Sequence, residues 1–379
     1  MRRFGVATWA LMGLVWPLSA QETVEFSGHT WTVTAPDARV EQYLGREALR
    51  LRNGGVFLTD LAFGDGVVEY DVATTGHRSF VGAALRVRQG ERVTYEEFYL
   101  RPHQSGRFDA LQYTPNFGGL TAWQLYPEYN RPVDIPRDRW IHVRLVVSGT
   151  KLTAFIDNAE EPAMVVEDLR LGTEPGGVGL YSNFPEAGTL DLHPTAFSNF
   201  KLTPADRDPE SSEAVSDPSP LPLGVIQAWA VSEAVPADGS PVLALDRGAL
   251  DALTWDVLRT DRAGRVNIAE YRAFPPEARQ GRVYARVLLH SDAPRTVKLN
   301  FGFSDQGSVF LNGELRFTGN NTYRSRSLRY LGVMTLDNDA LYLPLVEGEN
   351  ELVVAVTEAF GGWGLVAKLG DAEGVRISW

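Results

Sequence analysis

Apolar and polar residues alternate with period two along much of the first half of the chain. The alternation covers five stretches, at residues 66–72, 81–88, 93–103, 140–148 and 152–157. Such alternation predicts β-strands that have one buried and one solvated face. Because strands of this kind must bury their apolar face against a second layer, the pattern predicts a β-sandwich.

The second half shows a similar pattern after a short run, 250–258, that favours a helix. Strands are predicted there at 282–290, 296–304, 308–311 and 351–357. Residues 204–222, between the two halves, are rich in proline, serine and acidic residues and almost free of apolar ones, which is typical of a linker. The sequence therefore predicts an all-β protein with two separately folding β-sandwich (jelly-roll) domains, 22–203 and 223–379, joined by an exposed linker that proteases cut.

The composition removes several kinds of chemistry. The 379 residues include 36 glycines and 22 prolines, which favours a turn-rich β protein, and no cysteine. Without cysteine there is no disulfide framework, thiolate nucleophile, cysteine-held metal or lipoprotein acylation site. The six histidines form no pair at i, i+2 or i, i+4, and no loop has a diagnostic calcium-binding pattern. We therefore expect no cofactor. A structural calcium ion held by oxygen atoms is compatible with the sequence.

The first twenty residues have the organisation of a secretory signal. Arg2 and Arg3 precede an apolar stretch, 6–15, and small residues before Gln21, where the mature chain is predicted to begin. The apolar stretch is shorter than the ~18 residues that a membrane span needs. Loss of both arginines changes the formal charge from −12 to −14, which disfavours binding to nucleic acid and to anionic membranes. The sequence predicts an exported, soluble protein of the periplasm or extracellular space, and indicates no oligomeric state.

One predicted strand carries an unusual mixture of side chains on its polar face. In the third stretch, Glu97, Tyr99, Arg101 and His103 occupy alternate positions and so point the same way. The strand combines an acid, an aromatic ring, a cation and a titratable base, and it leads directly into a polar, aromatic segment at 101–126. We expect this segment to lie over the concave face of the first sheet.

Segment 101–126 combines planar hydrogen-bonding groups with flat aromatic rings. Sugars present hydroxyls at their edge and C–H groups on their face, so this mixture suits them. A long loop packed on the sandwich is the alternative explanation, and a ligand site is favoured because functional residues concentrate on loops held by a rigid scaffold. The predicted ligand-binding residues are Tyr99, Arg101, His103, Gln104, Asp109, Gln112, Tyr113, Trp123 and Gln124.

Several sequence patterns in the first half resemble a known superfamily. Residues 140–157, WIHVRLVVSGTKLTAFID, are similar to the strand pair of concanavalin A-like lectin/glucanase jelly rolls, which include laminin G-like domains. Residues 177–180 and 197–202 are similar to the closing strands of that superfamily. The run LRPHQSG…DALQYTP, 100–115, resembles exported bacterial proteins related to 3-keto-disaccharide hydrolases. The resemblance covers most of residues 22–203 and implies carbohydrate binding, glycan hydrolysis or a structural, protein-interaction role.

The catalytic pattern of the hydrolases in this superfamily is incomplete here. Laminarinase-like glycosidases carry Glu-x-Asp-x-x-Glu on one strand, whereas this chain has Glu69-Tyr-Asp71 and no second glutamate. Glu96 and Glu97 cannot replace the pair, because neighbours on a strand face opposite ways. If the protein is a hydrolase, His103 with Glu97 or Asp109 is the candidate acid–base set. The missing pair favours a carbohydrate-binding protein, with a glycan-active hydrolase as the alternative.

The second half resembles a different jelly roll. Residues 303–314, FSDQGSVFLNGE, are similar to the S-D-D-G…V-x-L-N-G hairpin of galactose-binding-like domains, and 345–365 resembles their last strands. Such domains occur as accessory modules of glycosidases. Asn312-Gly313 predicts a tight hairpin turn rather than a ligand contact. Asp305 and Trp363 are the candidate ligand contacts of this half, and packing and turn roles are alternatives at least as well supported.

Overall fold

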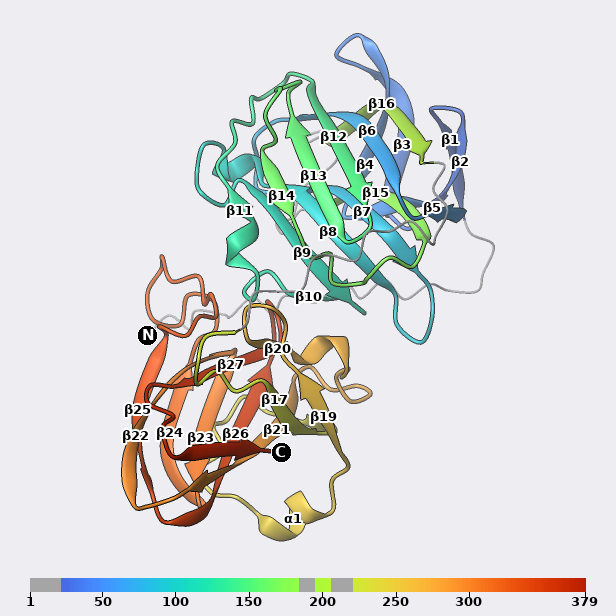
Figure 1. Ribbon diagram of the computed structural model, residues 1–379. Helices are drawn as coiled ribbons and strands as arrows, with labels where there is room; N and C mark the ends of the chain where they lie inside the picture. Colours follow the sequence, from blue (N-terminus) through green and yellow to red (C-terminus); the bar gives the residue numbers. More distant parts are fainter. Residues whose placement is uncertain (1–21, 184–194, 206–220) are drawn as a thin grey trace, which may run out of the picture. The chain divides into compact units, whose positions relative to one another are not determined.

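The computed structural model describes residues 22–183, 195–205 and 221–379 (Figure 1). The expected signal sequence and most of the expected linker lie outside these residues. The chain divides into two compact units: the first comprises Met1–Gly119 and Glu128–Ser216, and the second comprises Leu120–Pro127 and Asp217–Trp379. Both are built almost entirely of antiparallel strands, which confirms the predicted all-β class.

The first unit contains two sheets. One has the strand order β1 (Thr23–Phe26), β2 (His29–Val33), β5 (Gly54–Phe63), β15 (Gly176–Asn183), β7 (Phe80–Arg88), β8 (Thr94–Leu100) and β9 (Leu111–Phe117), with β11 (Asn130–Arg131) also paired to β9. The other has the order β14 (Met164–Val166), β13 (Lys151–Ile156), β12 (Ile141–Ser148), β6 (Gly66–Thr74), β16 (Thr195–Pro204), β4 (Arg46–Arg52) and β3 (Asp37–Tyr43). Short 3₁₀ turns lie at Pro102–Gln104 (η1) and Pro127–Tyr129 (η2).

The core of the first unit follows from the period-two pattern. Along β12, Ile141, Val143, Leu145 and Val147 are buried, and the residues between them are half-exposed. Apolar side chains from the other sheet, such as Leu180, join the same cluster. Burying one face of each sheet against the other removes this apolar surface from water, so the sandwich predicted from the sequence is confirmed.

The second unit also has two sheets. The larger has the order β19 (Trp255–Arg259), β17 (Ala228–Ser232), β21 (Gly281–Ser291), β26 (Gly348–Glu358), β23 (Gln306–Leu311) and β24 (Glu314–Asn320), with β18 (Val235–Pro236) and β28 (Val375–Ser378) also paired to β21. The smaller has the order β20 (Arg265–Asn267), β27 (Gly364–Leu369), β22 (Arg295–Ser304) and β25 (Asp339–Leu345). The unit further contains β10 (Leu120–Thr121), the helix α1 (Arg247–Asp251) and the 3₁₀ turn η4 (Ile268–Glu270).

Two local predictions in this unit have different outcomes. Asn312 and Gly313 both have positive φ, 51° and 83°, in the turn between β23 and β24, so the predicted tight turn is confirmed. The predicted helical run 250–258 is wrong in its second part, because α1 ends at Asp251 and β19 follows. Residues 255–259 pair with β17, so strand pairing decides the conformation there.

Residues 120–127 belong to the second unit, although the sequence placed them in the first domain. Gln124 is fully buried and donates its amide to the carbonyl of Gly332 over 2.9 Å. Arg265 donates to the carbonyl of Leu125, and its guanidinium lies 4.5 Å from the ring centre of Tyr126. The segment is therefore part of the packing of the second unit.

This arrangement changes what a domain dissection should give. A fragment of residues 217–379 is expected to be unstable by itself, because it lacks the buried side chains of Gln124, Leu125 and Tyr126 and leaves their partners unpaired. Thermal unfolding of this fragment, with and without a synthetic peptide of residues 118–129, would measure the effect. We expect the peptide to raise the melting temperature. A fragment as stable as the second unit of the full chain would contradict the assignment.

Among the described residues, no helix is long and apolar enough to cross a membrane.

Candidate functional site

One face of the first sheet points away from the core of its unit and carries polar and aromatic side chains. On β8, Phe98 and Leu100 join the core, so Glu97 and Tyr99 project from the other side. Strand register places Gln112 of β9 directly beside Tyr99. We call this side of β7, β8 and β9, which carries Tyr95, Glu97, Tyr99, Gln112 and Asn116, the polar face.

A chain of hydrogen bonds crosses the polar face. The Tyr99 hydroxyl donates to Oε1 of Gln112 over 2.8 Å, and Nε2 of Gln112 donates to Oδ1 of Asn130 over 2.6 Å. Tyr99 and Gln112 are 4% and 3% exposed, whereas Asn130, on β11, is half-buried. The chain therefore fixes the buried groups and ends at an amide that solvent reaches. Asn130 was missed in the sequence because only the pairing of β11 with β9 brings it here.

A phenylalanine connects the other predicted residues. The ring of Phe80 lies 5.9 Å from that of Tyr99 and 5.7 Å from that of His103, measured between ring centres. The guanidinium carbon of Arg101 lies 5.5 Å from the centre of the same ring, and Arg101 forms an ion pair with Asp109. Phe80 begins β7, far from segment 101–126 in sequence, so the segment alone did not reveal it.

His103 is not arranged as a general acid or base. Burial, and then the neighbouring Arg101, Arg78 and Arg107, lower its pKa to about 4, so the imidazole is neutral at pH 7. Among the described residues no hydrogen bond or ion pair joins it to Glu97 or Asp109, and Asp109 is paired with Arg101. The candidate acid–base set of His103, Glu97 and Asp109 is therefore not assembled around the imidazole.

Gln104 lies in η1, directly after His103. Its side-chain oxygen Oε1 is buried, and within the described part of the chain it accepts no hydrogen bond. A buried acceptor of this kind costs free energy when it is left unpaired, and such groups are often found where a ligand or water binds.

The structure separates three predicted ligand residues from this site. Tyr113 faces the core, is 1% exposed and donates its hydroxyl to Oε2 of Glu96 over 2.7 Å, so its ring is not available on the polar face. Trp123 and Gln124 belong to the second unit. The pairing of β9 with β8 explains this position. Tyr113 lies opposite Phe98, and Pro115 lies opposite Glu96, so Tyr113 shares the core-facing side with Phe98.

The Glu69 and Asp71 pair of the incomplete glycosidase pattern lies on the other sheet, on β6. Oδ1 of Asp71 lies 2.8 Å from Nδ1 of His142, and Oδ2 accepts from Nδ2 of Asn199 over 2.7 Å and from Arg46. Several partners thus hold this carboxylate in the described part of the chain. This is the environment of a structural ion-pair cluster.

The second unit contains two buried carboxyl groups next to each other. Asp305 accepts the backbone N–H groups of Ala359 and Phe360 over 3.1 and 2.9 Å, and Glu358 accepts that of Gly362 over 3.1 Å. Oδ1 of Asp305 and Oε2 of Glu358 have no hydrogen-bond partner in the described part of the chain. Burial raises the pKa of both groups, and the charge of Asp305 raises the pKa of Glu358 further.

Trp363, the other candidate contact of this half, is fully buried. Its indole N–H donates to the carbonyl of Val356 over 3.3 Å, and its ring packs against Phe274 with ring centres 5.5 Å apart. Of the two roles considered for Trp363, the structure therefore supports packing.

The chain matches no family model and no curated protein. Solved structures similar to it include the carbohydrate-binding module CBM66 from Bacillus subtilis, with 12% identity and a TM-score of 0.29 over 45% of this chain and 92% of that one. A β-glucanase from Bacillus licheniformis has 11% identity and a TM-score of 0.34 over 52% of this chain and 96% of that one. The galectin LEC-6 of Caenorhabditis elegans has 11% identity and a TM-score of 0.28 over 39% and 89%. TM-scores of this size leave the function to be decided by the geometry of the site.

Proposed function

We propose that the protein is an exported carbohydrate-binding protein and that the polar face of the first unit binds the sugar. The observation that carries this proposal is the arrangement around Phe80. Two aromatic rings, Phe80 and Tyr99, adjoin the Arg101–Asp109 ion pair on one side and the Gln112–Asn130 amide chain on the other.

Each part of this arrangement matches a part of a sugar. The half-buried ring of Phe80 can cover the C–H face of a pyranose, and the buried ring of Tyr99 supports it. Planar amide, carboxylate and guanidinium groups form paired hydrogen bonds with neighbouring hydroxyls. The unpaired oxygen of Gln104 offers a further acceptor. Because the chain of hydrogen bonds from Tyr99 to Asn130 already orients the amides, little ordering remains to be done on binding.

Binding without hydrolysis fits this site better than catalysis. A glycosidase needs a carboxyl group poised to donate a proton and a second carboxylate within about 10 Å of it. Here the titratable His103 is neutral at pH 7, because burial and the neighbouring Arg101, Arg78 and Arg107 lower its pKa, while Asp109 is held by Arg101. We therefore expect no release of reducing sugar from any glycan that binds.

A glycan-array screen followed by calorimetric titration with the best ligand would test this function. Phe80→Ala should weaken binding about tenfold or more, because the ring area against the sugar is lost together with the support of Tyr99 and Arg101. His103→Gln should have a mild effect, since the amide also donates and accepts hydrogen bonds.

Phe155→Ala is the matched control for Phe80→Ala. Phe155 is also a half-buried phenylalanine with a guanidinium over its ring, that of Arg144 at 3.8 Å, but it lies on β13 of the other sheet. Equal losses in the two variants would place the site elsewhere. A fall in turnover for His103→Gln, with affinity unchanged, would replace the binding function by hydrolysis.

A further inference from the structure

The second unit carries an aromatic cluster that the site on the first unit does not use. We define this aromatic cluster as Trp123, Tyr323 and Phe360, which come from three distant segments of the chain. The ring centre of Trp123 lies 5.9 Å from that of Tyr323 and 6.1 Å from that of Phe360. All three side chains are half-buried, so each ring keeps part of its surface in water.

The loop that supplies Tyr323 is basic within an acidic protein. Residues 321–336 contain three arginines and no acidic residue, whereas the whole chain has a formal charge of −12. Arg326 is neutralised by Asp339 over 2.9 Å. Arg324 is exposed, and its guanidinium carbon lies 4.8 Å from the centre of the Tyr323 ring. Among the described residues Arg324 has no ion-pair partner, so a cation stands free beside the aromatic cluster.

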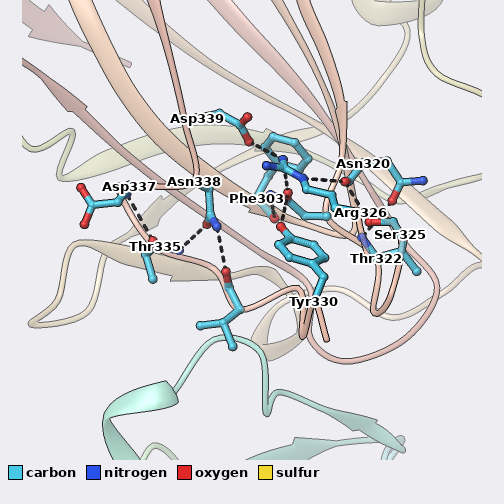
Figure 2. A network of polar contacts seen from close by, with 12 residues as sticks. Phe303, Asn320, Thr322, Ser325, Arg326, Tyr330, Thr335, Asp337, Asn338 and Asp339 are labelled. Carbon is cyan, nitrogen blue, oxygen red and sulfur yellow. Dashed lines mark hydrogen bonds and ion pairs between the residues drawn. The ribbon is translucent and has the colours of Figure 1, made fainter. Parts of the chain in front are cut away.

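The loop is held in place before any ligand arrives. Figure 2 shows Arg326 and Tyr330 converging across it, and both donate to Oδ1 of Asn321. The far end is closed by Asn338, which accepts from the backbone N–H of Thr335 over 2.6 Å and donates to the carbonyl of Val333 over 3.0 Å. The backbone N–H of Arg324 donates to the carbonyl of Tyr330 over 2.8 Å. A loop fixed by so many bonds loses little entropy on binding.

We propose that the aromatic cluster and Arg324 form a second binding site, which takes an acidic sugar such as a uronate residue of a polysaccharide. The rings of Trp123 and Tyr323 stand nearly perpendicular, at 83°, so one ring of the aromatic cluster supplies the flat apolar surface that a pyranose ring covers and the others flank it. The guanidinium fork supplies paired donors for a carboxylate. A neutral sugar would leave the arginine unused, and inorganic phosphate would leave the rings uncovered. This site lies in the second unit and does not depend on the polar face of the first.

Calorimetric titration of the full chain with trigalacturonate and with the neutral trisaccharide cellotriose would test the proposal. The variant Phe80→Ala serves as background, because it weakens the first site and so reduces its contribution. We expect this variant to bind trigalacturonate at least tenfold more tightly than cellotriose. In that background Arg324→Gln should remove the preference, and Arg324→Lys should retain part of it because it keeps the charge without the fork. Tyr323→Ala should weaken binding of both sugars.

Arg329→Gln is the matched control, because Arg329 is an exposed arginine of the same loop. It should change the affinity for trigalacturonate less than twofold. An equal loss in Arg324→Gln and Arg329→Gln would show a diffuse basic field and overturn the site. Since Arg324 has a positive φ of 64°, Arg324→Asn, which tolerates that conformation, serves as a second variant if Arg324→Gln lowers the melting temperature.

A membrane surface is the competing partner, because Leu328 at the same loop is 84% exposed and adjoins Arg329. In sedimentation with vesicles of phosphatidylcholine and phosphatidylglycerol, we expect no membrane binding that depends on Leu328. Membrane binding that the variant Leu328→Ser abolishes would be the contrary result. Such binding, in the absence of trigalacturonate binding, would overturn the proposal. If Phe80→Ala does not change glycan binding, the proposal for the first site fails and the proposal for this second site is unaffected. The failure of one proposal is therefore distinguishable from the failure of the other.

Discussion

Replacing Arg86 with methionine is expected to destabilise the first unit by about 3–5 kcal/mol, the cost typical of breaking a buried charge pair by removing one partner. Arg86 is fully buried. It donates to the carbonyls of Gly64 over 3.1 Å, of Gly149 over 2.7 Å and of Gly172, and it pairs with Asp65 over 3.2 Å. These acceptors lie in separate loops, which one guanidinium thus joins.

The loss is expected to be large because nothing in a methionine replaces the donors. Three carbonyls and the half-buried Asp65 carboxylate would each lose a bond to the guanidinium, and part-buried acceptors that lose their donor are costly. Burial lowers the pKa of Arg86, while Glu96 and Asp65 raise it, which reflects how strongly its charge depends on these partners.

Calorimetric unfolding of Arg86→Met, Arg86→Lys and Arg88→Met would measure the effect. Lysine keeps the charge but reaches fewer carbonyls, so Arg86→Lys is expected to lower the free energy of unfolding by less than Arg86→Met. Arg88 is the matched control, because it is half-exposed and donates only to Leu171 among the bonds described for it, over 3.1 Å. A loss below about 1 kcal/mol in Arg86→Met would contradict the role of Arg86, since surface substitutions cost about that much or less.

The variant Asp305→Asn is expected to stabilise the second unit at pH 8 and to do so by a smaller amount at pH 5. Asp305 and Glu358 are 1% and 0% exposed, and among the described residues no cation contributes to the pKa shift of either. Both pKa values are raised, by burial and, for Glu358, by the neighbouring charge. The folded unit therefore retains a proton that the unfolded chain has already released.

The sign of the pH dependence follows from this difference. Between the ordinary carboxyl pKa near 4 and the raised values, the folded state binds more protons, so its stability falls as the pH rises through that window. Each proton retained in this way corresponds to about 1.4 kcal/mol per pH unit. Removing one of the two acids should flatten the slope, while the amide oxygen can still accept from the N–H groups of Ala359 and Phe360.

Thermal unfolding of the wild type and Asp305→Asn at a series of pH values from 5 to 8 would test this. The wild type and the variant must be compared at the same pH. Burial also raises the pKa of Glu96, in the first unit, to about 7, so the stability of the first unit changes with pH as well. Asp337→Asn, at an exposed aspartate of the same unit, should leave the slope unchanged. A variant that is destabilised equally at pH 5 and pH 8 would show that only the hydrogen bonds of Asp305 matter.

The sequence by itself determined the class of the fold and much of its strand pattern. The alternation in 140–148 predicted which side chains of β12 are buried, because a strand places successive residues on opposite faces. The same rule correctly separated Glu96 from Glu97 and placed Tyr99 on the face away from the core. These properties depend on local periodicity, which one stretch of sequence contains.

The tertiary structure decided which residues meet. Phe80, Asn130 and Tyr323 became neighbours of predicted site residues only through strand pairing and loop closure, which bring together positions far apart in the chain. Segment 101–126 reads as one continuous polar and aromatic run, yet its residues 120–127 belong to the second unit. No local pattern separates Gln112 from Gln124, because their roles depend on the groups that surround each amide after folding: Tyr99 and Asn130 for one, and the carbonyl of Gly332 for the other.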